Sequence, residues 1–251
     1  MRAPLIAGNW KMHKTSSETE EFITRFLSLV PQTTAEILLI PPYTSLDRAG
    51  RMLRGTGIAL GAQDLHPEVR GAFTGAVSAE MLVDCGCRYV LVGHSERRHV
   101  FGEQDDLVGR KLCAALAVGL RPVLCVGETL SERRDGATER VLERQLDSGL
   151  RGLMPNAIAD LVMAYEPVWA IGTGETATAS QAQDAAAWIR GWVCDRLSRS
   201  TGDAVRILYG GSVKPDNASG LLALADVDGV LVGGASLDPS GFAQIVAGTG
   251  I

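Results

Sequence analysis

The stretch GVLVGGAS, residues 229–236, begins with four uncharged residues in succession, which are followed by a pair of glycines. A short apolar run without polar alternation is typical of a parallel strand that is buried on both faces. Seven further runs, each four or five residues long and mostly continuous, precede it along the chain. The eight runs are Leu5–Gly8, Ile37–Ile40, Ile58–Ala62, Tyr89–Val92, Pro122–Val126, Leu161–Ala164, Val205–Tyr209 and Gly229–Val232. We therefore expect eight buried strands.

Stretches with helical spacing lie between these runs, and each would turn one apolar stripe towards a sheet. Three such stripes are Phe22, Ile23, Phe26, Leu27 and Val30; Leu107, Leu112, Ala115 and Leu116; and Trp188, Ile189, Trp192, Val193 and Leu197. Favourable N-cap residue types predict helix starts at Thr15, Ser45, Ser131 and Ser180. Glu18 lies three residues after Thr15, which is the spacing of a capping box.

The strand-then-helix pattern repeats eight times over 251 residues. Each unit takes about 31 residues, close to the ~30 residues of one strand–helix–strand step. Right-handed crossovers make consecutive strands neighbours. Eight units of this length predict an α/β fold of the (β/α)8 barrel type, with residues 1–251 as a single catalytic domain. Periodicity alone leaves a doubly wound sheet open.

Composition excludes several classes of protein. Hydrophobic residues make up 46% and charged residues 21%, which excludes disordered and collagen-like chains. The net charge is −5 and basic clusters are no longer than a pair, so we expect no nucleic-acid partner and no membrane partner. No apolar run approaches the ~18 residues of a spanning helix, and the first run is too short for a signal peptide. We therefore expect a cytoplasmic protein.

The five cysteines are an odd number and include no C-x-x-C pair. This pattern favours reduced thiols over a disulfide framework or a zinc site. The motifs contain no cluster of carboxylates or histidines with the spacing of metal ligands. We expect neither a metal nor a cofactor.

Polar residues follow the first and fourth runs, where the active site of a barrel would lie. Asn9 and Lys11 are two residues apart, so on an extended strand end they would face the same way. Lys11 is a candidate anchor for an anion, and a surface lysine packed on Trp10 is the alternative. His94 precedes a short predicted helix whose N-terminus would lower its pKa, and a histidine that only caps this helix is the alternative. The other histidines are interpreted as loop or surface residues: His13, His66 and His99.

Glu166 follows the sixth run, and Pro167 comes directly after it. Apolar neighbours would desolvate the carboxylate and raise its pKa towards the range of a general base. The proline restricts Glu166 to extended backbone geometry. Residues 168–174, VWAIGTG, are apolar and then rich in glycine, which suits a lid with flexible ends.

Two glycine pairs, Gly210–Gly211 and Gly233–Gly234, follow the seventh and eighth runs. Glycines let backbone N–H groups approach a ligand closely. Phosphate sites in barrels lie in these two loops, so the pairs predict a phosphate site. Two tight turns without a ligand are the alternative.

Five segments resemble the triosephosphate isomerase family, in the family's order and spacing. They are GNWKM (Gly8–Met12), VGHSERR (Val92–Arg98), AYEPVWAIGTG (Ala164–Gly174), YGGSVKP (Tyr209–Pro215) and GVLVGGASL (Gly229–Leu237). GAQDLHPEVRGAFTGA (Gly61–Ala76) resembles the family's dimer-interface loop, and LCVGE (Leu124–Glu128) resembles its fifth strand end. The resemblance covers the full length and implies a TIM barrel isomerase of glycolysis and gluconeogenesis. Its reaction would interconvert dihydroxyacetone phosphate and D-glyceraldehyde 3-phosphate through an enediolate.

The resemblance also implies the roles of the catalytic residues. Glu166 would be the base, His94 the neutral electrophile and Lys11 the electrostatic stabiliser of the enediolate; the Glu–His pairing is known for the family. Asn9 and Lys11 would hold substrate oxygens. Glu96 would position Lys11 and His94.

Further roles implied by the resemblance concern the phosphate, the lid and a partner. Backbone N–H groups would bind the phosphate at Gly172, Ser212, Gly233 and Gly234. The lid would comprise Pro167, Val168, Trp169, Gly174 and Glu175. Tyr209 and Ser212 would latch the closed lid. Thr74 would project towards Lys11 and His94 of the partner subunit, which implies a homodimer.

The chain departs from the family's pattern at three positions. Glu175 stands at the C-terminal hinge of the lid, where the family usually has Lys. Because of this change, the family pattern does not predict the rate at which the lid opens. Asp64 replaces a usual Asn and Ala76 a usual Glu, which alters polar contacts around the loop that carries Thr74. These two changes leave dimer stability and substrate preference open.

Other functions stay open at the level of sequence. An isomerase of a four-carbon ketose phosphate would use the same residues, since one more carbon changes the volume of the cavity and not the motifs. A Schiff-base aldolase would need a strand lysine facing the cavity, where the sixth strand end carries Glu166 instead. A binding protein without activity would not need the full set of catalytic side chains.

Overall fold

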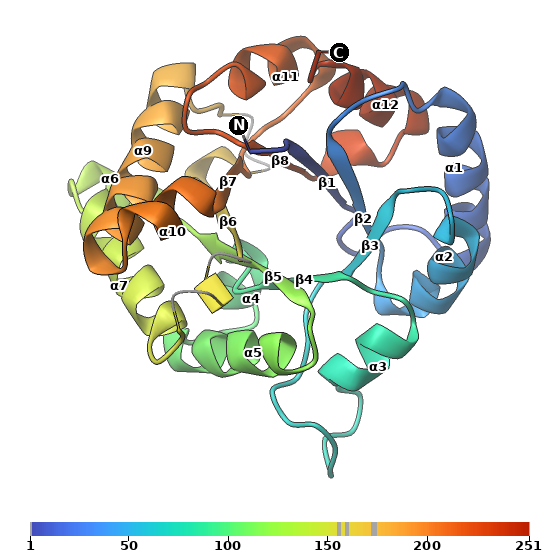
Figure 1. The fold of residues 1–251 in the computed structure, drawn as a ribbon, viewed down its shortest axis with the longest axis horizontal. Helices are drawn as coiled ribbons and strands as arrows, with labels where there is room; N and C mark the ends of the chain where they lie inside the picture. Colours follow the sequence, from blue (N-terminus) through green and yellow to red (C-terminus); the bar gives the residue numbers. More distant parts are fainter. Residues whose placement is uncertain (1, 155–156, 159–160, 172–174, 251) are drawn as a thin grey trace.

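Eight parallel strands form a closed barrel in the order of the chain, and β1 pairs with β8 to complete it (Figure 1). The structure is a computed structural model that describes residues 2–154, 157–158, 161–171 and 175–250. The strands are β1 (Leu5–Asn9), β2 (Glu36–Ile40), β3 (Ala59–Ala62), β4 (Tyr89–Val92), β5 (Arg121–Val126), β6 (Val162–Tyr165), β7 (Arg206–Tyr209) and β8 (Gly229–Val232). The predicted (β/α)8 barrel is confirmed, and because the sheet closes, the doubly wound alternative is excluded.

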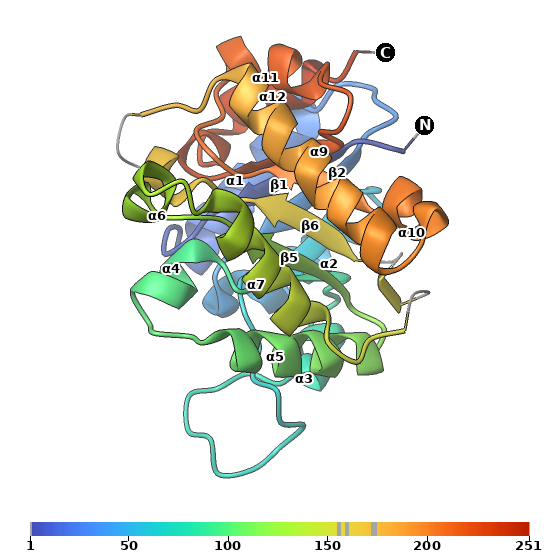
Figure 2. The ribbon, with the colours of Figure 1, turned by 90° about the vertical axis from the view of Figure 1, so that its left-hand side faces the viewer.

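Helices surround the barrel as a ring (Figures 1 and 2). They are α1 (Ser16–Leu29), α2 (Leu46–Leu53), α3 (Ala79–Asp84), α4 (Ser95–His99), α5 (Asp105–Ala117), α6 (Leu130–Arg134), α7 (Thr138–Leu150), α9 (Ala179–Arg196), α10 (Arg199–Ala204), α11 (Pro215–Leu222) and α12 (Pro239–Ala247), with 3-10 turns η1 (Tyr43–Ser45), η2 (Val168–Ala170) and η3 (Gly234–Ser236). None of the helices in the described ranges has the length and apolar content that a membrane span needs. The cytoplasmic location stays a prediction.

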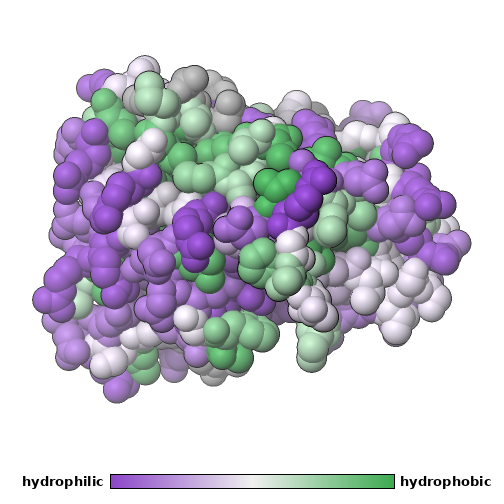
Figure 3. All heavy atoms as spheres, turned by 90° about the horizontal axis from the view of Figure 1, so that it is seen from below, coloured by the Kyte–Doolittle hydropathy of each residue, from purple (hydrophilic) through white to green (hydrophobic). Residues whose placement is uncertain are grey.

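The loop between β3 and α3 projects away from the barrel (Figures 1 and 2). The His66 N–H donates to the Val77 carbonyl at 2.8 Å and closes the base of the loop, and the His66 ring lies 4.2 Å from that of Phe73. Thr74 is exposed next to Phe73. Figure 3 views the face that carries this loop, where hydrophobic and hydrophilic residues lie side by side. The loop therefore presents apolar groups to solvent within this single chain.

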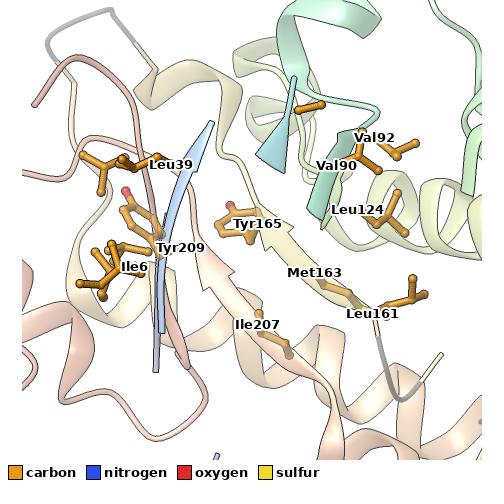
Figure 4. Close-up of a cluster of buried hydrophobic side chains, with 14 of the residues drawn as sticks. Ile6, Leu39, Val90, Val92, Leu124, Leu161, Met163, Tyr165, Ile207 and Tyr209 are labelled. Carbon is orange, nitrogen blue, oxygen red and sulfur yellow. The ribbon is translucent and has the colours of Figure 1, made fainter. Parts of the chain in front are cut away.

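Both faces of each strand are buried, which explains the continuous apolar runs. On β1, Leu5 and Ala7 belong to a cluster made only of strand residues, which fills the barrel. Ile6, between them, belongs to the layer shared with the helices. Figure 4 shows part of this outer layer, with side chains from β1, β2, β4, β5, β6 and β7: Ile6, Leu39, Val90, Val92, Leu124, Met163, Tyr165, Ile207 and Tyr209 among them.

The predicted start of the first helix is confirmed. The Thr15 hydroxyl accepts from the Glu18 N–H at 3.4 Å, and the Glu18 carboxylate accepts from the Thr15 N–H at 2.7 Å. Ser45 is the N-cap residue of α2, but its hydroxyl accepts from the Thr19 hydroxyl at 3.0 Å instead of from the helix. Its side chain therefore links α1 to α2.

The helix starts predicted at Ser131 and Ser180 are wrong. The N-cap residues are Thr129 and Thr178, and each completes a capping box with the residue three positions on. Each box starts its helix before the serine, which then falls in the first turn. Two neighbouring hydroxyl residues compete for the cap here, and the sequence offered no rule to choose between them.

A buried ionic network connects β3, α4 and α5. The Lys111 ammonium, 3% exposed, pairs with Asp64 at 2.6 Å and also with Glu103. The Arg97 guanidinium pairs with the same two carboxylates, at 3.2 Å and 2.6 Å. Two cations thus face two anions, so Asp64 completes a charge-balanced network instead of leaving a positive excess.

We expect Lys111→Met to destabilise the fold by about 3–5 kcal/mol, because it leaves two carboxylates in a buried site with one cation. Urea unfolding of both proteins at pH 7 measures the difference. The control is Arg51→Met, which removes an exposed i,i+4 pair with Asp47 at 3.0 Å and should cost no more than about 0.5 kcal/mol. Equal stability losses in the two variants would contradict the role given to the network.

Candidate active site

A cavity of about 360 Å³ lies at the mouth of the barrel, where the strands end. It is lined by residues that follow β1, β4, β6, β7 and β8. The predicted site residues among its lining are Asn9, Lys11, His94, Glu166, Ser212, Gly233 and Gly234. Side chains separated by more than 200 positions in the sequence therefore share one cavity.

The backbone of Lys11 adopts a left-handed conformation, with φ of 52°. Such a conformation is unfavourable for a residue with a side chain and is held by its surroundings. The Asn9 side-chain oxygen accepts from the Lys11 N–H at 3.0 Å, and Gln63 donates to the Lys11 carbonyl at 2.7 Å. The explanation from extended alternation was wrong: β1 ends at Asn9, and Lys11 reaches the cavity through a turn.

Gln63 is a further residue of the site that was not predicted from the sequence. Its side-chain amide also donates to the Ile40 carbonyl at 3.2 Å, so it connects the ends of β1 and β2. Gln63 directly follows β3, and the rule that favoured Asn9 and His94, a polar residue after an apolar run, applies to it as well. Its contribution is to hold the backbone of Lys11.

His94 caps helix α4 and faces the cavity at the same time. Its Nδ1 accepts from the Glu96 N–H at 3.2 Å, and an accepting nitrogen carries no proton. Nε2 lies 3.0 Å from Glu166 Oε1 and is the nitrogen that carries the proton. The two interpretations left open by the sequence are therefore compatible, because each uses a different nitrogen.

Glu166 is 2% exposed and directly follows β6. Oε2 accepts from the Ser95 N–H at 2.9 Å, while Oε1 faces His94. The backbone of Glu166 leaves room only for glycine at position 127, since a Cβ there would lie 1.8 Å from the Glu166 carbonyl oxygen. A Cβ at Gly210 would lie 2.9 Å from Glu166 Cγ. The neighbouring strand ends therefore fix where this carboxylate can lie.

The expected rise in the pKa of Glu166 is wrong for this conformation. Burial raises the pKa, but the charge and hydrogen bond of His94, the Ser95 N–H and Lys11 together lower it below the ordinary value. The expected fall in the pKa of His94 is wrong as well. Burial lowers it, but the Glu166 carboxylate outweighs burial and raises it. Apolar neighbours are visible in the sequence, whereas the hydrogen-bond donors that face the carboxylate come from another element and are not.

Lys11, which lines the cavity, forms an ion pair with Glu96, with 2.7 Å between Nζ and Oε1. Glu96 Oε2 also lies 3.7 Å from His94 Nδ1. The structure thus brings Glu96 into contact with both residues that it was expected to position.

The surroundings of the two glycine pairs differ. A Cβ at Gly211 would lie 2.1 Å from the Tyr209 hydroxyl, so Gly210 and Gly211 make room for side chains. Gly233 borders Lys11, and a Cβ at Gly234 would have open space around it. Both pairs line the cavity, and the phosphate site expected at these two loops stays a prediction. Gly172, the remaining predicted phosphate contact, lies outside the described residues.

The first half of the predicted lid is anchored by a carboxylate that the sequence analysis did not single out. Glu128 is fully buried and accepts from the Trp169 indole N–H at 2.9 Å and from the Tyr165 hydroxyl at 3.1 Å. Its carbonyl accepts from the Val168 N–H at 3.1 Å. Arg133 pairs with Glu128 at 3.1 Å and lies over the Trp169 ring.

The other lid residues differ in what the structure describes of them. Pro167 is buried directly after Glu166, and Glu175 is exposed. Gly174 lies outside the described residues. Thr74 does not line the cavity of its own chain; it lies on the projecting loop. His13, interpreted from sequence as a surface residue, is exposed but also lines the cavity.

The cavity offers a cation, a carboxylate, an imidazole N–H and open backbone at a glycine pair. Among the residues that the structure describes, no group of three or more His, Cys, Asp or Glu side chains could hold a metal ion. The arrangement suits a small anion, with a carboxylate placed to accept and return a proton.

Comparison with known proteins identifies the family. The model of the family described as triosephosphate isomerase matches residues 4–249. The chain belongs to the triosephosphate isomerase family. Among its relatives, the triosephosphate isomerase of Moorella thermoacetica is 52% identical over 98% of both chains. That of Symbiobacterium thermophilum is 51% identical over 98% of this chain and 97% of the relative, and that of Roseiflexus sp. is 51% identical over the same shares.

We expect Glu166 to titrate below 4.5 in the ligand-free isomerase, because His94 and the Ser95 N–H favour the ionised form. Carboxyl carbon-13 NMR measures the midpoint, with Glu166→Gln to assign the resonance. Ser95→Pro removes the N–H donor at the first position of α4, where proline fits after the extended backbone of His94.

The proline variant should raise the midpoint of Glu166 by about one to two pH units, since a hydrogen bond to a charged group contributes ~1.5–3 kcal/mol. A midpoint above 4.5 in the unaltered protein would contradict the assignment. An unchanged midpoint in Ser95→Pro would show that the N–H does not stabilise the carboxylate.

Proposed function

We propose that this chain is a triosephosphate isomerase, which interconverts dihydroxyacetone phosphate and D-glyceraldehyde 3-phosphate by proton transfer through an enediolate. The observation that carries the proposal is the meeting of Glu166, His94 and Lys11 in one cavity beside an open glycine pair. The names of the relatives support the same reaction. We further propose that residues 1–251 act as one catalytic domain.

The phosphate group of the substrate would bind at the loops after β7 and β8. Backbone N–H groups of Ser212, Gly233 and Gly234 would donate to its oxygens, and Gly172 would join them from the lid. Gly233 lies next to the Lys11 side chain, with 3.5 Å between a Cβ at this position and Lys11 Cε. A substrate held here would therefore bring its remaining oxygens to Lys11 and Asn9.

To act as the base, the Glu166 carboxylate would break its contacts with His94 and the Ser95 N–H and turn to the substrate. The carboxylate takes a proton from the carbon next to the carbonyl, and the electron pair of that C–H bond moves towards the carbonyl oxygen. The His94 Nε2–H donates to this oxygen. The hydroxyl proton on the first carbon's oxygen passes to the former carbonyl oxygen, so that the first carbon becomes the new carbonyl. Glu166 returns its proton to the neighbouring carbon, so no proton is gained or lost overall.

The departure of Glu166 would also lower the pKa of His94. The carboxylate is the main cause that raises the pKa of His94, whereas burial and Lys11 lower it. Once the carboxylate turns to the substrate, the two lowering causes dominate. A neutral imidazole can then donate a hydrogen bond to the enediolate without giving up its proton.

Lys11 would stabilise the negative charge of the enediolate. A cation about 4 Å from a unit anion contributes roughly 4 kcal/mol at an effective dielectric constant of 20. A positioned base contributes about 10²–10⁴-fold. Neither effect accounts for enzymatic rates alone, so exclusion of water by the lid is part of the proposal.

We expect Glu166→Asp to lower kcat by roughly 10²–10³-fold with a modest change in KM, because a shorter side chain withdraws the carboxylate by about 1 Å or more. A coupled assay on both triose phosphates measures the rates. Glu139→Asp, an exposed glutamate on α7, is the matched control and should keep full activity.

Turnover near the wild-type level in Glu166→Asp would remove this residue from the role of base. Faster turnover of a four-carbon ketose phosphate than of the triose phosphates by the unaltered protein would favour the tetrulose reaction instead. Absence of turnover on all of these substrates would sink the proposed function.

We also propose a homodimer in which Thr74 approaches Lys11 and His94 of the partner subunit. Large apolar side chains near the projecting loop and the cavity mouth support it, since contiguous exposed apolar groups mark interaction surfaces. Three strongly exposed apolar residues that follow β1 and α4 are Met12 at 93%, Val100 at 74% and Phe101 at 65%. The Asp64 network lies below this surface and is balanced within one chain, so the dimer would rest mainly on apolar contact.

We expect Thr74→Arg to raise the dimer dissociation constant roughly 30-fold or more, because an unpaired charge buried in an interface costs about 2–5 kcal/mol. Sedimentation velocity measures the mass, with a monomer of 26.6 kDa. Gln244→Arg on the exposed face of α12 adds the same charge away from the loop and should leave the mass unchanged. A Thr74→Arg protein that keeps both its dimer mass and its activity would refute this interface.

A further inference from the structure

The net charge of the protein has the same sign as that of its proposed substrate. The chain carries a net charge of −5, and a sugar phosphate is an anion, so the overall field repels the substrate from a distance. Attraction has to come from cations close to the cavity mouth. Two lysines line the cavity, Lys11 and Lys214.

The two lysines differ in whether their charge is compensated. The Lys11 ammonium lies 2.7 Å from the Glu96 carboxylate, so its field is largely cancelled at a distance. Lys214 is exposed, and within the described parts of the chain it forms no ion pair. Its positive charge is therefore the one that reaches into solvent at the cavity mouth.

The backbone of Lys214 is fixed although its side chain extends into solvent. Lys214 is the N-cap residue of α11, and its N–H donates to the Asn217 side chain at 2.8 Å. The Asn217 amide in turn donates to the Ser212 carbonyl at 3.1 Å. The ammonium is thus attached to the same short loop that carries Ser212, two residues away.

We propose that Lys214 is a capture residue, which raises the rate at which the anionic substrate reaches the cavity and takes no part in the proton transfer. The inference rests on the proposed function. A cleft with low-dielectric walls focuses the field of a cation at its mouth and can raise association rates. Such an effect weakens as salt shortens the Debye length from about 30 Å at 0.01 M to about 3 Å at 1 M.

The test compares Lys214→Gln with Arg199→Gln in the triose phosphate assay across ionic strengths. Arg199 is 91% exposed on α10, at the end of the barrel opposite α4 and α6 (Figure 2). Both variants lower the net charge by one, so only the position of the lost charge differs. At about 0.01 M ionic strength Lys214→Gln should lower kcat/KM roughly two- to five-fold, with kcat unchanged, whereas Arg199→Gln should have no effect.

The salt dependence separates capture from direct binding. At about 0.5 M salt the kcat/KM values of Lys214→Gln and the unaltered protein should converge. A loss that persists at high salt, a fall in kcat, or an equal loss in Arg199→Gln would overturn the proposal. An unchanged kcat/KM at low salt would overturn it as well. Absence of turnover in the unaltered protein would instead count against the proposed function itself.

Discussion

The pairing of β1 with β8 is the constraint on which the rest of the structure depends. It turns an open sheet into a ring, so the ends of all eight strands meet at one rim. Asn9 comes from the first strand and Gly233 follows the last, yet both line one cavity because the ring has no edge. The interior of the ring is filled by strand side chains, so the cavity has a rigid floor.

Above this floor, the structure holds the reactive groups in mutual contact. The Glu166 carboxylate uses His94 and the Ser95 N–H as partners, and Lys11 uses Glu96. Each group is satisfied without a ligand, and each of these partners lies at or beside the cavity. A bound substrate would therefore exchange one set of hydrogen bonds for another instead of creating charges in an apolar site. The pKa of Glu166 is lowered in the ligand-free state for the same reason.

The sequence predicted the parts of the fold that follow from repetition. Eight apolar runs predicted eight strands, and polar residues after them located His94 and Glu166 at the cavity. It did not predict contacts between distant side chains. Gln63 and Glu128 act through hydrogen bonds to other strand ends, which no local pattern encodes. The directions of the pKa shifts were wrong for the same reason, because donors from another element decided them. The roles of the site residues stay predictions that the experiments above address.

The left-handed backbone at Lys11 has a consequence for the thermal stability of this protein. A residue with a side chain in this conformation costs of order 1–3 kcal/mol, and glycine would relieve that cost. Selection for thermal robustness alone would therefore favour loss of the ammonium group that the reaction uses. Lysine at this position therefore trades folding stability for its ammonium group, so the engineering of a heat-resistant variant has to leave Lys11 unchanged.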